Sequence, residues 1–143
     1  MRNFRGFLWI CVFLFLAHGV SYGQSKQGNI IDVTYTECVE KDTSVGNICT
    51  CAFDAYAKWD KLMDREYKKL LKSLRLDKDK TALKQAQNAW IAYRDNEFKS
   101  YDNIFNHPGN KWCLLRANGR IDIVRARALQ LQAYNNAFDK HKL

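Results

Sequence analysis

The sequence contains a single proline, Pro108, and has no glycine between Gly46 and Gly109. Proline breaks helices because it lacks a backbone N–H, and glycine weakens them because its backbone is so free. Alternating apolar and polar residues, the pattern of half-buried strands, are almost absent as well. The scarcity of helix breakers and of strand patterns predicts an all-α protein with long helices.

Motifs of several enzyme classes are also missing. The sequence has no glycine-rich phosphate loop, no HExxH zinc motif and no GxSxG nucleophile motif. It has no CxxC pair, and His107 and His141 are separated along the chain from most of the cysteines, which argues against a metal site. Its lysines and arginines are scattered, with no basic-aromatic patch for nucleic acid. These absences favour a binding protein without a cofactor, metal or nucleic acid partner over an enzyme.

Residues 1–23 have the layout of a signal peptide. Two arginines precede an unbroken apolar run over residues 7–17, and small residues follow, ahead of a cleavage site near Gly23 and Gln24. The run is too short to span a bilayer as a helix, so an uncleaved anchor is the less favoured alternative. We therefore expect a periplasmic or secreted protein with one mature domain over residues 24–143.

The formal net charge of the whole chain is +8. It falls to +6 without the leader, which carries two arginines and no acidic residue. A basic exported domain is attracted to anionic surfaces such as lipid head groups and glycans. Binding of anionic lipid or glycan through this surface is therefore one functional alternative.

The mature chain keeps four cysteines, Cys38, Cys49, Cys51 and Cys113. An even number in an exported protein predicts two disulfides. Cys49 and Cys51 are too close to pair with each other without strain, and on a helix they would point about 200° apart. Each should therefore pair with either Cys38 or Cys113, which leaves two connectivities open.

Apolar residues recur at three- and four-residue steps in four segments, which is the periodicity of amphipathic helices. The segments are residues 31–41, 45–76, 81–105 and 111–138. Residues 77–80 are polar and predict a short turn, and Pro108 ends the third segment. Gly119 is expected to bend the fourth helix. Short connections favour antiparallel neighbours, so the sequence predicts a small antiparallel bundle of one short and three long helices, braced by two disulfides.

Polar residues interrupt the apolar stripe of the third segment. Gln87, Trp90 and Arg94 share one helical face. A buried arginine must be paired, so Arg94 should face Asp60 or Asp64 on the preceding helix, and Gln87 should donate to the same carboxylate or to a loop backbone.

Two hypotheses account for this polar group. In one, Asp60, Asp64, Arg94 and Asp95 form an acid–base or ligand site. In the other, they form a clamp that fixes the register of the helices, as buried polar networks commonly do. We favour the clamp.

The residues around this group resemble those of the LprI-like lysozyme-inhibitor family of small exported bacterial proteins. The most specific element is the pattern QxxWxxxRD, formed here by residues 87–95. Further matching positions are Cys38, Cys51, Trp59, Asp60, Asp64, Tyr67, Arg127 and Leu131. The resemblance implies a binding role, inhibition of lysozyme by occlusion, with lysozyme or another envelope or host protein as partner and no catalytic residue.

The resemblance also bears on the cysteines and on docking. It favours Cys38–Cys51 with Cys49–Cys113 over Cys38–Cys49 with Cys51–Cys113. Animal lysozymes are typically basic, so a basic inhibitor needs a locally acidic patch to dock one. Two sets of residues could provide it. They are Asp60, Asp64 and Glu66, or Glu37 and Glu40.

Overall fold

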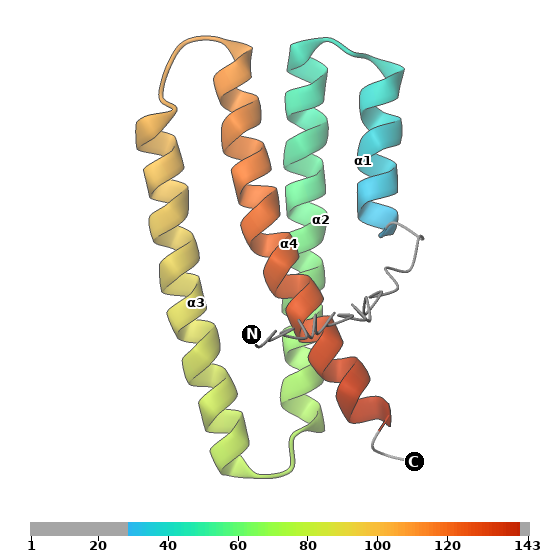
Figure 1. Cartoon of the computed structure of the whole chain (residues 1–143), viewed down its shortest axis with the longest axis vertical. Helices are drawn as coiled ribbons and strands as arrows, with labels where there is room; N and C mark the ends of the chain where they lie inside the picture. Colours follow the sequence, from blue (N-terminus) through green and yellow to red (C-terminus); the bar gives the residue numbers. More distant parts are fainter. Residues whose placement is uncertain (1–28, 141–143) are drawn as a thin grey trace, which may run out of the picture.

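A computed structural model describes residues 29–140 of the chain, and within them it consists of helices without strands. The helices are α1 (Ile30–Lys41), α2 (Val45–Ser73), α3 (Asp77–Ile104) and α4 (Asn110–Lys140). Each long helix runs antiparallel to the next along the chain, and short α1 lies beside the first half of α2 (Figure 1). The predicted bundle of one short and three long helices is confirmed.

The signal peptide predicted for residues 1–23 lies outside the described residues. No helix within residues 29–140 combines the length and apolar character needed to cross a membrane.

The connection between α2 and α3 lies earlier in the chain than predicted. Leu74 and Leu76 have extended backbone dihedrals and flank the helix ends, so the turn lies at residues 74–76. Residues 77–80, predicted to be this turn, instead form the first turn of α3. Asp77 and Asp79 suit that position because the N-terminus of a helix carries partial positive charge.

The core lies mainly between α2 and α4, which cross in close contact in Figure 1. Trp59 of α2 and Val124 and Leu131 of α4 are fully buried, and small residues let the helix backbones approach. The alanines of this contact are Ala52 and Ala55 on α2 and Ala117 and Ala128 on α4. We call this contact the α2–α4 seam.

Helix α3 is attached differently. Gln87 is its one fully buried residue, and its apolar side chains, such as Leu83, Trp90 and Phe98, are half-buried against the core. Near its C-terminal end, the ring of Tyr101 packs on Gly119 of α4, where a Cβ atom would lie 2.7 Å from Tyr101 Cε2. Gly119 therefore permits close approach of α3, and α4 continues through it as a helix.

Two disulfides tie the helices together at one end of the bundle. Cys38–Cys51 joins α1 to α2, and Cys49–Cys113 joins α2 to α4, with Cα–Cα distances of 5.9 and 6.1 Å. This is the pairing that the family resemblance favoured. We call the end that carries these bonds, together with the α1–α2 and α3–α4 loops, the disulfide end (Figure 1).

Candidate binding site

Charge is distributed unevenly along the described chain. Residues 30–57, which we call the acidic segment, carry five carboxylates and one cation, Lys41. Residues 58–84, the basic segment, carry ten lysines and arginines and five carboxylates. The acidic segment comprises α1, the α1–α2 loop and the first part of α2, and so forms one side of the disulfide end, whereas the basic segment continues along α2 into α3. A protein of positive net charge therefore still has an acidic region.

The residues of the sequence motif meet where α2, α3 and α4 face one another. Arg94 of α3 lies with its Nη1 atom 3.6 Å from Oδ1 of Asp60 on α2. Its Nε and Nη2 atoms also donate to Oδ1 of Asp95, at 2.9 and 2.7 Å. Asp64, the other expected partner of Arg94, is paired instead with Lys68 at 2.6 Å and is exposed. The structure thus brings Asp60, Arg94 and Asp95 together and leaves Asp64 apart.

Gln87 makes a buried link between helices. Its Nε2 atom donates to Sδ of Met63 at 3.2 Å, and its Oε1 atom accepts from Nε and Nη2 of Arg127 at 3.0 and 2.9 Å. The expectation that Gln87 donates to a carboxylate of α2 or to a loop backbone is therefore wrong. Burial lowers the pKa of the Arg127 guanidinium, because removal from water disfavours the charged form.

Both of these arginines lie near the ring of Trp90. The guanidinium carbons of Arg94 and Arg127 lie 5.4 and 5.9 Å from the ring of Trp90, within the range of cation–π contacts. Trp59 packs in the core beneath Arg125, and Tyr67 is half-buried at the edge of the same core. Of the four residues of the clamp hypothesis, only Asp60 and Arg94 make a contact between two helices, so the clamp remains a prediction.

Sequence reasoning missed a second buried polar contact. Glu66 is 6% exposed, and Nδ2 of Asn135, from α4, donates to both its backbone oxygen and Oε2 at 2.9 Å. Arg65 pairs with its Oε1 at 3.0 Å. One signal was present in the sequence, because Glu66 stands four residues from both Leu62 and Leu70 and so shares their buried face.

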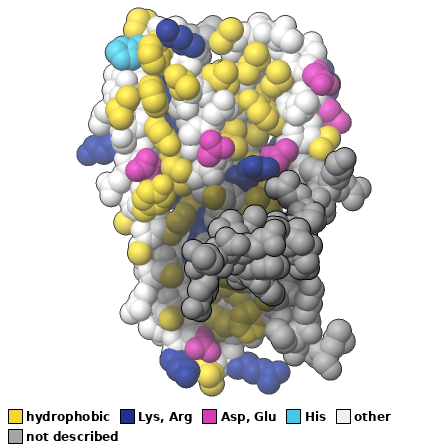
Figure 2. All heavy atoms as spheres, in the orientation of Figure 1, with side chains coloured by type: hydrophobic (Ala, Val, Ile, Leu, Met, Phe, Trp, Pro, Cys, Tyr) yellow, Lys and Arg dark blue, Asp and Glu magenta, His cyan; other side chains and the backbone are white. Residues whose placement is uncertain are grey.

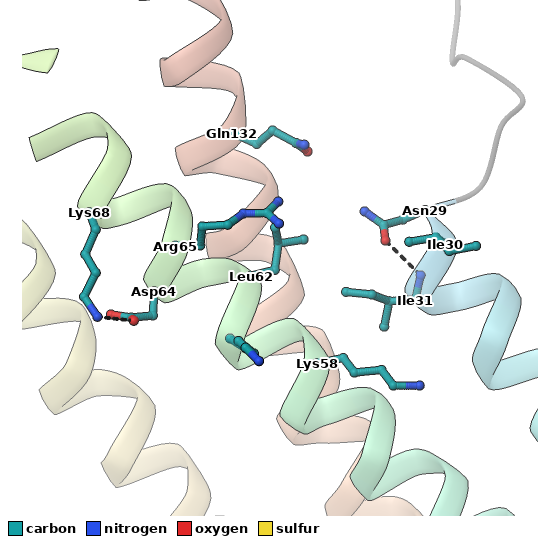
Figure 3. A pocket seen from close by; sticks show the side chains of 10 residues that line it. Asn29, Ile30, Ile31, Lys58, Leu62, Asp64, Arg65, Lys68 and Gln132 are labelled. Carbon is teal, nitrogen blue, oxygen red and sulfur yellow. Dashed lines mark hydrogen bonds and ion pairs between the residues drawn. The ribbon is translucent and has the colours of Figure 1, made fainter. Parts of the chain in front are cut away.

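A groove opens between the start of α1, the middle of α2 and α4, and encloses about 640 Å³ (Figure 3). Its walls include Ile30 and Ile31 from α1 and Leu62 from α2, beside several lysine and arginine side chains of the basic segment. Within the described residues, no group of histidine, cysteine and acidic side chains is arranged to hold a metal ion.

Comparison with known proteins identifies a family and solved structures of similar fold. A family model described as lysozyme inhibitor LprI matches residues 26–131. A crystal structure of an uncharacterised protein from Burkholderia thailandensis matches with a TM-score of 0.72 and 22% identity, over 80% of this chain and 57% of that one. The chain thus spans little more than half of that relative, and the likeness concerns the fold alone. Among curated proteins, none matches significantly.

Proposed function

The chain belongs to the LprI family of lysozyme inhibitors, and from this premise we propose that it is an exported binding protein that inhibits a lysozyme and is not an enzyme. The family match carries the proposal, because it extends through α1, α2 and α3 and most of α4. The two disulfides support export, since such bonds persist in oxidising compartments.

Docking to a basic lysozyme requires an acidic surface, and one of the two expected patches does not supply it. Glu66 is buried against Asn135, Asp60 lies beside Arg94, and Asp64 is paired with Lys68. Each of these carboxylates already has a partner.

The acidic segment is the better docking surface. Glu37 and Glu40 of α1 are exposed and form no ion pair within the described residues. Asp42 follows after Lys41, and its oxygens accept hydrogen bonds from the backbone N–H and the hydroxyl of Ser44 at the start of α2. We propose that these three carboxylates steer a basic lysozyme to the disulfide end.

The same end is held rigidly, which favours binding because little conformational entropy is lost when a partner docks. The disulfides fix α1 and α4 to α2 there, and Nδ2 of Asn47 donates to the backbone oxygens of Cys38 and Asp42 at 3.3 and 2.6 Å. The α3–α4 side adds an aromatic stack in which Phe105 lies between Tyr101 and Trp112, at centroid distances of 6.0 and 6.1 Å. Aromatic side chains of this kind often anchor protein interfaces.

A cell-wall lysis assay tests the proposal. The protein is exported through its own leader, purified with its disulfides formed, and mixed at increasing molar ratio with several types of lysozyme. We expect the lysis rate to fall as the ratio rises for at least one type, with a basic lysozyme inhibited most strongly. Undiminished lysis by every type at large molar excess would overturn the proposal.

A further inference from the structure

The groove between α1, α2 and α4 combines an apolar wall with a cationic rim, and nothing in the lysozyme-inhibitor proposal uses it. Ile31 and Leu62 are each 8% exposed and form the inner wall, whereas Ile30 is 70% exposed at the mouth. Figure 3 shows Ile31 extending from α1 toward Leu62 and Arg65, with Ile30 beside it at the start of α1. The volume of the open groove, about 640 Å³, is within the range of sites for small molecules.

The rim carries four cations from a single helix. Lys58, Lys61, Arg65 and Lys68 stand three or four residues apart on α2 and therefore lie along one face. Like charges at this spacing repel one another and lower the stability of the helix. An anion lying against the row would relieve this repulsion.

Intramolecular ion pairs neutralise only part of this row. Arg65 is paired with Glu66 at 3.0 Å, and Lys68 with Asp64 at 2.6 Å, the one carboxylate among the lining residues. Lys58 and Lys61 are exposed and have no ion pair within the described residues. The groove therefore presents two uncompensated ammonium groups next to an apolar wall.

We propose that this groove binds a single-chain anionic amphiphile, a molecule with one alkyl chain and a carboxylate or phosphate head. The head lies against Lys58 and Lys61, and the alkyl chain lies along Ile30, Ile31 and Leu62. Charge complementarity selects an anion, the isoleucines and leucine select an alkyl chain, and the limited volume selects one free molecule over a bilayer surface. The sequence suggested, as an alternative function, that the basic surface binds anionic lipid or glycan. The present proposal narrows that alternative to one groove and one class of ligand.

Titration calorimetry with laurate, kept below its micelle-forming concentration, tests the proposal on the oxidised protein. We expect saturable binding of one laurate per chain. The variant Lys58→Glu with Lys61→Glu should weaken this binding by about tenfold or more, because two attractive charges become repulsive. The matched variant Lys78→Glu with Lys84→Glu makes the same change of net charge on exposed positions of α3 and should leave the affinity unchanged.

The apolar wall is tested separately with Ile30→Ser. This residue is 70% exposed, so the substitution should leave the fold intact and still weaken laurate binding. Thermal melting of every variant checks that the fold is retained.

Four results would overturn the proposal. The first is that laurate does not bind saturably. The second and third are that the uncharged detergent dodecyl maltoside, or inorganic phosphate, binds with the same affinity as laurate. The fourth is that the protein cosediments with phosphatidylglycerol vesicles but does not bind free laurate. A loss of affinity in the Lys78→Glu, Lys84→Glu control as large as that in the groove variant would also overturn it. None of these results depends on lysozyme inhibition.

Discussion

The acidic and basic segments are neighbours in the sequence, but the fold holds them by different means. Within the acidic segment, Ile31 is the one buried residue of α1, and both disulfides of the described chain attach to this segment. The basic segment contains no cysteine and is held by Trp59, Leu62 and Leu70 packing toward α4, with Glu66 bonded to Asn135. Cys38–Cys51 ties short α1, which buries little apolar area, to α2, and Cys49–Cys113 ties the start of α2 to α4, whereas the basic segment is held without covalent ties. Both segments can therefore keep charged outer surfaces of opposite sign.

The largest effect should come from breaking the seam that holds the basic segment. Trp59 is fully buried in α2, and Trp59→Ala should lower the free energy of unfolding by about 3–5 kcal/mol because it removes apolar contacts and leaves a cavity. Urea unfolding followed by circular dichroism measures this loss. A loss below about 1 kcal/mol would mean that the seam does not dominate stability.

Removal of the disulfides should destabilise the acidic segment by less. Replacing Cys49 and Cys113 by alanine opens a loop of 64 residues and should cost about 4 kcal/mol at most, and replacing Cys38 and Cys51, 13 residues apart, about 3 kcal/mol. Amide hydrogen exchange should rise mainly in α1 when Cys38–Cys51 is absent. Equal acceleration throughout α2 would contradict the separate anchoring of the two segments.

The polar attachment of α3 should contribute a smaller amount. Gln87→Ala removes the acceptor of the buried Arg127 guanidinium and should lower the free energy of unfolding by about 2 kcal/mol. Gln85→Ala, at an exposed position of the same helix, is the matched control and should change stability by less than about 0.5 kcal/mol. If both variants lose the same stability, Gln87 does not fix α3 to α4.

The charge of the acidic segment should matter for binding and little for stability. Glu37→Lys with Glu40→Lys changes two exposed residues and should shift the free energy of unfolding by less than about 1 kcal/mol. Its association with a basic lysozyme should slow markedly, and added salt should no longer slow it, because the local attraction has become a repulsion. Asp77→Lys with Asp79→Lys makes the same change of charge at the other end of the bundle, and stopped-flow measurement should show a much smaller loss. Equal losses in the two variants would indicate that net charge alone governs association.

Much of the fold follows from local patterns in the sequence, and the misplaced turn between α2 and α3 also has a local cause. The spacing of Trp59, Leu62 and Leu70 predicts the buried face of α2. The turn at residues 74–76 was missed because two leucines there continue the apolar periodicity, so the polar residues that follow looked like the break.

The candidate site divides in the same way. A paired Arg94 follows from its place on an apolar face, but Asp60 and Asp64 share a stripe, and only the packing of α3 decides between them. The link between Gln87 and Arg127 joins residues 40 positions apart, and no local pattern indicates it.

The central claim is that the disulfide end, with its acidic segment, is the surface that binds lysozyme. Hydrogen exchange of the oxidised protein, measured with and without a saturating basic lysozyme, tests this claim directly. The account predicts slower exchange in residues 37–48 and around Trp112, with residues 68–84 unchanged. Slower exchange confined to residues 68–84 would contradict it.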